Sequence, residues 1–65
     1  MTLPERIHER RKAAGLTQEQ AGELAGVPQP QWSDWERGRW GERLTLQTLR
    51  KIAKGLGCTV GELID

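Results

Sequence analysis

The sequence predicts an all-α fold built from five short helices. Apolar residues recur every three or four positions, and the strict alternation that indicates a strand is missing. Threonines able to cap a helix precede four of the five segments, and glycines suited to ending a helix follow the first four. With 65 residues the chain has room for a single domain, residues 1–65, and no linker or repeat divides it.

The first helix is expected over about residues 3–14. Thr2 can accept a hydrogen bond from the first turn and Glu5 can accept one in return, which makes a capping box. Pro4 is tolerated there because the first turn leaves its N–H groups unpaired in any case. Gly15 suits the left-handed conformation that ends a helix.

The second helix is short and well delimited. Thr17 and Gln20 form a second capping box, and Gly26 ends the helix after two turns. The third helix is expected from about Pro30 to Arg37. Because a proline ring disfavours the helical conformation of the preceding residue, Gln29 is expected outside this helix, which would then begin a residue or two late.

The fourth helix is capped by Thr45 and ended by Gly57. Its apolar face consists of Leu46, Leu49, Ile52, Ala53 and Leu56. A last capping box, Thr59 with Glu62, opens a short fifth helix. Residues 39–44, between the third and fourth helices, have no apolar period and are expected to form a loop.

Composition excludes several classes of protein. Hydrophobic residues make up 35% of the chain and charged residues 29%, which is typical of a soluble globular domain. No apolar run is long enough for a membrane span, and no signal peptide is visible. The one cysteine, Cys58, cannot form an internal disulfide, which predicts a cytoplasmic protein with a buried, unreactive thiol.

Few side chains are available for catalysis. The chain has one histidine, one cysteine and no tyrosine, and it lacks a metal-spaced cluster and a glycine-rich phosphate loop. The histidine, His8, lies in a charged helix and is expected to be solvated. We therefore predict a binding protein rather than an enzyme, with no catalytic residue, metal, cofactor or small-molecule ligand.

Positive charge is concentrated in residues 37–54. The whole chain has a net charge of +1, but this segment carries six basic residues against one acidic residue, a balance of +5. The basic residues are Arg37, Arg39, Arg43, Arg50, Lys51 and Lys54. A polyanion would be attracted to them, although the same charges can also form an ordinary solvated face.

Residues 16–38 have the signature of a helix-turn-helix, two helices of about two turns joined by a short turn that contains glycine. The first of these helices has small residues, and the second has bulky ones, where the two are expected to cross. The small residues are Ala21, Gly22 and Ala25, and the bulky residues are Val27, Trp32 and Trp35. Both tryptophans are therefore expected in the core rather than stacked on nucleic acid, and a leucine at position 21 would overfill that core.

Four segments carry a resemblance to a known family. They are 11–20 (RKAAGLTQEQ), 26–27 (GV), 35–38 (WERG) and 52–60 (IAKGLGCTV). Together they resemble the Cro/phage-repressor (xenobiotic-response-element type) helix-turn-helix family over nearly the whole chain. The resemblance implies a compact, five-helix, lambda-repressor-like domain that binds duplex DNA as a homodimer on a palindromic operator. It also implies that the protein represses or, alternatively, activates transcription.

The resemblance assigns roles to individual residues. The third helix, about 30–37, would enter the major groove as the recognition helix. The residues implied to contact bases are Gln29, Gln31, Ser33 and Asp34, and those implied to contact phosphates are Gln18, Arg37, Arg39 and Arg43. Gln29 can pair with adenine, and Asp34 can accept from a cytosine amino group. As an alternative, Gln29 and Gln31 are solvated turn residues.

Two further assignments follow from the resemblance. Arg11 on the first helix and Glu36 at the end of the recognition helix match a pair that the family commonly forms, in which the arginine fork grips the carboxylate. The alternative is two unrelated surface charges. The implied dimer surface lies near the fourth and fifth helices and includes Trp40, Leu63 and Ile64. Trp40 can instead pack on its own domain or stack on a DNA sugar.

A second class of function is left open by the sequence. Pro28 and Pro30 stand where the family has polar residues, Asp34 would repel phosphates, and the net charge is low. These features favour a protein-interaction module, antitoxin-like or adaptor-like, that uses the same fold. Selection of binding sites from random duplex DNA distinguishes the two classes.

Overall fold

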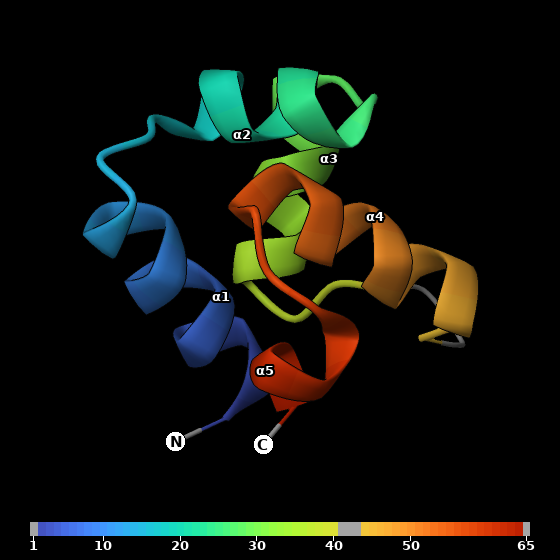
Figure 1. Cartoon of the computed structure of the whole chain (residues 1–65). Helices are drawn as coiled ribbons and strands as arrows, with labels where there is room; N and C mark the ends of the chain where they lie inside the picture. The colour runs from blue at the N-terminus through green and yellow to red at the C-terminus, as the bar shows by residue number, and fades with distance from the viewer. Residues whose placement is uncertain (1, 41–43, 65) are drawn as a thin grey trace.

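Residues 2–40 and 44–64, which the computed structural model describes, form five α-helices (Figure 1). The helices are α1 (Leu3–Ala13), α2 (Gln18–Ala25), α3 (Gln29–Glu36), α4 (Leu46–Leu56) and α5 (Val60–Ile64). The predicted all-α, five-helix fold is therefore confirmed. None of the helices in these two ranges is long and apolar enough to cross a membrane.

Threonine caps begin four of the helices, as predicted. The capping boxes of Thr2 with Glu5 and of Thr17 with Gln20 are both complete, so each pair exchanges hydrogen bonds in both directions. Thr59 does the same at α5, where its Oγ1 accepts from the N–H of Glu62 at 3.1 Å. Each cap involves residues only three positions apart, and this is why the sequence could predict it.

The start of α3 differs from the prediction. The helix begins at Gln29 rather than after it, and Pro28 is the N-cap in an extended conformation, φ −64° and ψ 154°. The carbonyl of Pro28 accepts from the N–H groups of Gln31 at 3.1 Å and Trp32 at 3.2 Å. Gln29 precedes Pro30 and would therefore prefer extended backbone, but these two bonds and the burial of Trp32 outweigh that preference. The two prolines themselves are tolerated because a helix leaves the N–H groups at positions 28 and 30 unpaired in any case.

The core lies between α1, α3, α4 and α5, with α2 closing it from above in the view of Figure 1. Trp32 is fully buried and Trp35 is 4% exposed, so the prediction that both pack inside is confirmed. Their rings meet edge to face, with centroids 5.5 Å apart. The opposing surface has small residues: a Cβ added at Gly55 would lie 2.8 Å from the carbonyl oxygen of Ala21 and 3.0 Å from the Trp32 ring.

Two apolar residues lie elsewhere than predicted. Leu46 is 54% exposed, because the first turn of α4 projects beyond the other helices (Figure 1). Leu63 is fully buried, since α5 packs against both α1 and α4. The prediction that Leu63 lies on a dimer surface is therefore wrong. Two arginines of α1 also bond to the backbone of α5. Arg6 donates to the carbonyl oxygen of Leu63 at 3.4 Å, and Arg10 donates to that of Glu62 at 2.9 Å.

Candidate nucleic-acid interface

The pair α2 and α3 forms a helix-turn-helix. Gly26 ends α2 in the left-handed conformation, φ 80°, and the N–H of Val27 donates to the carbonyl of Gly22 at 2.8 Å. A Cβ added at Gly22 would lie 3.0 Å from the carbonyl oxygen of Val27. A side chain at position 22 would therefore push the turn away from α2 by a few tenths of an ångström, and its absence lets the turn close tightly against this helix.

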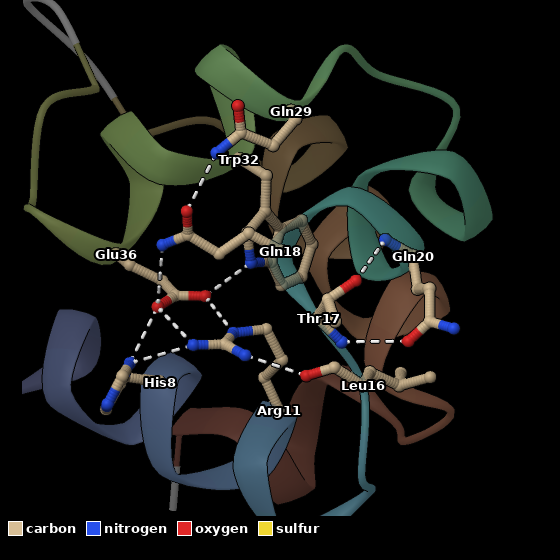
Figure 2. A network of polar contacts seen from close by, with 9 residues as sticks. All are labelled: His8, Arg11, Leu16, Thr17, Gln18, Gln20, Gln29, Trp32 and Glu36. Atoms are coloured by element: carbon tan, nitrogen blue, oxygen red, sulfur yellow. Dashed lines mark hydrogen bonds and ion pairs between the residues drawn. The ribbon is translucent and has the colours of Figure 1, made fainter.

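The carboxylate of Glu36, the last residue of α3, ties this helix to the rest of the domain (Figure 2). Its Oε2 accepts from Arg11 Nε at 2.6 Å and from Trp32 Nε1 at 2.5 Å. Its Oε1 lies 2.7 Å from His8 Nδ1, 3.3 Å from Arg11 Nη2 and 3.3 Å from Gln18 Nε2. The Glu36 side chain is only 4% exposed, so this charge depends on the protein rather than on water for its partners.

Burial raises the pKa of Glu36, but the donated hydrogen bonds, of which that from Arg11 contributes most, outweigh burial and lower the pKa to about 2. The same guanidinium donates from Nη1 to the carbonyl of Leu16 at 2.7 Å. Arg11 thus joins α1, the segment before α2 and the end of α3. The pairing with Glu36 that the family resemblance implied is present as a direct contact.

Gln18, the first residue of α2, bridges Glu36 to the start of α3 (Figure 2). Its Nε2 faces the carboxylate, and its Oε1 accepts from Gln29 Nε2 at 2.8 Å. Both ends of the Gln18 amide are therefore engaged within the domain. What Gln18 offers to an external anion is its backbone N–H, which lies in the first turn of α2 where a helix leaves such groups unpaired.

The outer side of α3 carries the residues predicted to contact bases. Gln29 and Gln31 are exposed, and Ser33 and Asp34 are half-buried. A hollow of about 590 Å³ lies beside Gln31 and Asp34 and is bounded on its other side by Trp40. The inner side of the same helix is sealed into the core by its tryptophans. Hence α3 presents a polar face outward and an apolar face inward.

The arginines predicted to contact phosphates follow α3 directly. Arg37 and Arg39 are exposed, and the N–H of Arg39 donates to the carbonyl of Asp34 at 2.8 Å, which holds the start of the loop against the helix. Arg43 lies outside the described residues. Within residues 2–40 and 44–64, the ion pairs are those of Glu36 with Arg11 and His8, so the charges of Arg37 and Arg39 are left without an acidic partner there.

A family model described as helix-turn-helix matches residues 7–63. The chain belongs to the Cro/C1-type helix-turn-helix family. As a member of this family it is a DNA-binding transcriptional regulator. Among curated proteins, none matches the chain significantly in sequence.

Solved structures agree with this assignment. The restriction-modification controller protein C.AhdI from Aeromonas hydrophila is 31% identical, with 95% of this chain and 87% of that chain covered and a TM-score of 0.83. The DNA-binding domain of the P22 C2 repressor is 30% identical, with 98% and 82% covered and a TM-score of 0.82. The clp gene regulator ClgR from C. glutamicum, at 24% identity, 95% and 78% coverage and a TM-score of 0.81, shares the fold.

One partner of Glu36 in this Cro/C1-type domain, His8, was not predicted from the sequence. His8 was expected to be solvated, and 44% of its side chain is exposed, but its Nδ1 also lies 2.7 Å from Glu36, a contact that was not predicted. A carboxylate cannot donate, so Nδ1 must carry the proton of this bond. The available signal was spacing: His8 precedes Arg11 by three positions on α1 and shares its face.

The remaining residues singled out in the sequence differ in how far they are buried. Trp40 is half-buried and packs against the core, and Ile64 is 55% exposed. Cys58 is half-buried against the core, and burial raises the pKa of its thiol, which favours the unreactive protonated form. In the described part of the chain, no three metal-ligating side chains are grouped.

Proposed function

We propose that the protein binds a specific duplex sequence as a homodimer on a palindromic operator and represses transcription there. One observation carries the proposal: α3 has its inner face sealed by Trp32 and Trp35, whereas its N-terminal turns present exposed Gln29 and Gln31. A helix held in this way can enter the major groove with its first turns at the base edges. The proposal requires no cofactor, metal, small-molecule ligand or catalytic residue, and it places the protein in the cytoplasm.

The base contacts are assigned by chemistry. Gln29 would take adenine, whose N6 amino group donates and whose N7 accepts, and Gln31 would read an adjacent position. Asp34 would accept a hydrogen bond from a cytosine amino group. It would also weaken binding to DNA that has no cytosine at this position, because the phosphates would then repel an unpaired carboxylate. Ser33, half-buried on the same helix, would donate to the flanking bases or backbone.

Phosphate contacts would hold the helix in register. Arg37 and Arg39 are exposed next to α3 and have no acidic partner among residues 2–40 and 44–64, and Arg43 follows in the sequence of the same loop. The first N–H groups of α2 at Gln18 suit an anion. The two similar proteins at 30% identity or more support this proposal, since one is named as a controller protein and the other as the DNA-binding domain of a repressor.

The dimer would be formed through the candidate residues Trp40 and Ile64. Both side chains remain accessible, in contrast to Leu63. A two-fold arrangement would place two copies of α3 about one helical turn of DNA apart, so the operator would contain two half-sites with that spacing.

Selection from randomised duplex DNA tests the proposal. We expect enrichment of a two-fold symmetric site with half-sites centred about 10 base pairs apart, together with a dimer by sedimentation on that site. Recovery of unrelated sequences at equal affinity would contradict DNA recognition and favour the protein-interaction module instead. A specific but asymmetric site bound by one copy would contradict the homodimer alone.

A further inference from the structure

Three basic residues of segment 37–54 are not used by the proposed DNA contacts. They lie on α4, their side chains are exposed, and they fall within about 100° of one another around the helix. The residues are Arg50, Lys51 and Lys54, which we call the α4 basic stripe. No acidic residue lies on α4, and the ion pairs in residues 2–40 and 44–64 are those of Glu36. The stripe therefore keeps its positive charge within this part of the chain.

The stripe is turned outward from the core. Position 55 of α4 faces inward, since a Cβ added at Gly55 would lie 3.0 Å from the Trp32 ring. Because a helix turns by about 100° per residue, Arg50 lies about 140° and Lys54 about 100° around α4 from that position. Lys51 is closer, about 40° away, and its side chain is exposed as well. All three charges are therefore accessible to a partner outside the domain.

The α4 helix also lies on the far side of the domain from the residues proposed to read bases. Gln29 and its partner Gln18 are in the foreground of Figure 2, and the ribbon of α4 lies behind them. In Figure 1, by contrast, α4 lies in front of α3. A duplex bound along α3 would therefore leave the stripe uncovered.

The composition of the stripe favours a nucleic acid over a protein as its partner. Protein interfaces are enriched in aromatic residues and depleted of lysine, whereas α4 has two lysines here and no aromatic residue. The large apolar side chain exposed on α4 is Leu46, in its first turn. A second copy placed face to face across a two-fold axis would bring the same positive charges together, which is unfavourable.

Duplex DNA matches the stripe in charge and in scale. Arg50 and Lys54 are about 6 Å apart along the helix axis, and a duplex carries one phosphate charge per about 1.7 Å of its own axis. Three cations at this spacing can therefore meet several phosphates at once. Lysine and arginine side chains that contact phosphates carry no sequence information, so the contact would not depend on sequence.

We propose that the α4 basic stripe holds a second segment of duplex DNA through its phosphates while α3 occupies the operator. The inference rests on the proposed function, because it requires an operator bound on the opposite face. The domain then joins two duplexes, or two distant segments of one duplex. Since the attraction comes from phosphate charge, it weakens steeply as the salt concentration rises.

The test asks whether protein bound to an operator duplex captures a second duplex. The operator recovered by selection is immobilised and saturated with protein, and a fluorescent duplex without the operator is added at several salt concentrations. Lys54→Gln removes one charge of the stripe, and the double variant Arg50→Gln with Lys54→Gln removes two. The matched control is Lys12→Gln, since Lys12 is an exposed lysine on α1. Operator affinity is measured separately by fluorescence anisotropy, and circular dichroism confirms that each variant is folded.

The expected result is a loss of capture without a loss of operator binding. The wild type should retain the fluorescent duplex at low salt, and log capture should fall against log salt with a slope of about 2.7 for three phosphate contacts. Lys54→Gln should reduce this slope by about one and the double variant by about two. Lys12→Gln should behave as the wild type, and all the variants should bind the operator with unchanged affinity.

Two results would overturn the inference and leave the proposed function intact. In the first, the double variant captures the second duplex as well as the wild type does and with the same slope. In the second, the operator is bound but no second duplex is captured even at low salt, which would leave an acidic protein as the partner of the stripe. A wild type that selects no operator would instead overturn the proposed function, and the inference with it.

Discussion

Nε of Arg11 on α1 lies 2.6 Å from Oε2 of Glu36, the last residue of α3. The same guanidinium holds the carbonyl of Leu16 just before α2. One side chain, 12% exposed, therefore positions both helices of the helix-turn-helix relative to α1. The orientation of α3 therefore depends on a partly buried ion pair, and a substitution of either Arg11 or Glu36 should disturb it.

Replacing Arg11 should destabilise the domain. We expect Arg11→Met to lower the free energy of unfolding by on the order of 2–4 kcal/mol, because Glu36 stays buried without its strongest partner. Urea denaturation measures the change. Lys12→Met, at an exposed position on the same helix, is the control and should have little effect. An Arg11→Met domain as stable as the wild type would show that the pair contributes nothing.

Glu36 should make stability depend on pH in the acid range. Its folded-state pKa of about 2 lies below the ordinary value of 4.5, so the unfolded chain takes up the proton first as the pH falls. The contribution of Glu36 is complete above pH 4.5 and is lost toward pH 2. Between these limits, the wild type should lose on the order of 2 kcal/mol more than Glu36→Gln. Thermal melts of both proteins across this range measure the difference, and parallel curves would contradict it.

Gly55 should not tolerate a side chain. A Cβ there would lie 2.8 Å from the Ala21 carbonyl oxygen and 3.0 Å from Ala25 Cβ, so Gly55→Ala forces α2 and α4 apart. This cost should exceed the gain of about 1 kcal/mol that alanine brings within a helix, and the melting temperature should fall. Gly61→Ala in α5 is the matched control, because its nearest neighbour would be 3.8 Å away. A rise in melting temperature for both variants would mean that α2 can shift freely.

Position 21 should be intolerant of larger residues for the same reason. Ala21 is fully buried, so Ala21→Leu should cost about 1–3 kcal/mol by overpacking, which lowers the melting temperature of a domain this small by several degrees. Ala13→Leu adds the same atoms at an exposed position and should be neutral. Calorimetry compares the two. An Ala21→Leu protein that melts at or above the wild-type temperature would contradict the complementarity of small α2 residues and tryptophans.

DNA affinity should fall steeply with salt concentration, because arginines next to α3 would displace counterions from the duplex. Arg39→Ala should reduce the slope of log affinity against log salt by about one unit. Arg10→Ala removes the same charge from a residue bonded to the carbonyl of Glu62 in α5 and should leave the slope unchanged. Fluorescence anisotropy at several salt concentrations provides the slopes. Equal slopes for Arg39→Ala and the wild type would remove Arg39 from the phosphate contacts.

Apart from the start of α3, the helix ends were predictable from the sequence because they depend on local rules, and so was the apolar character of the core. A threonine cap acts on a residue three positions away, and a glycine ends a helix through its own backbone conformation, so both are visible in a short window. The burial of Trp32 and Trp35 followed from volume, since the residues opposite them are small. The family resemblance added the pairing of Arg11 with Glu36, which no local pattern indicates.

Tertiary structure decided the contacts that join residues distant in the chain. The partly exposed side chain of His8 also bonds to Glu36, 28 positions away, and Leu63, which was expected on the surface, is covered by α1 and α4. Likewise, Gln29 is helical despite the following proline, and its amide donates a hydrogen bond to Gln18. The free energies that determine these positions belong to packing and to a buried charge, which exist only once the helices have assembled.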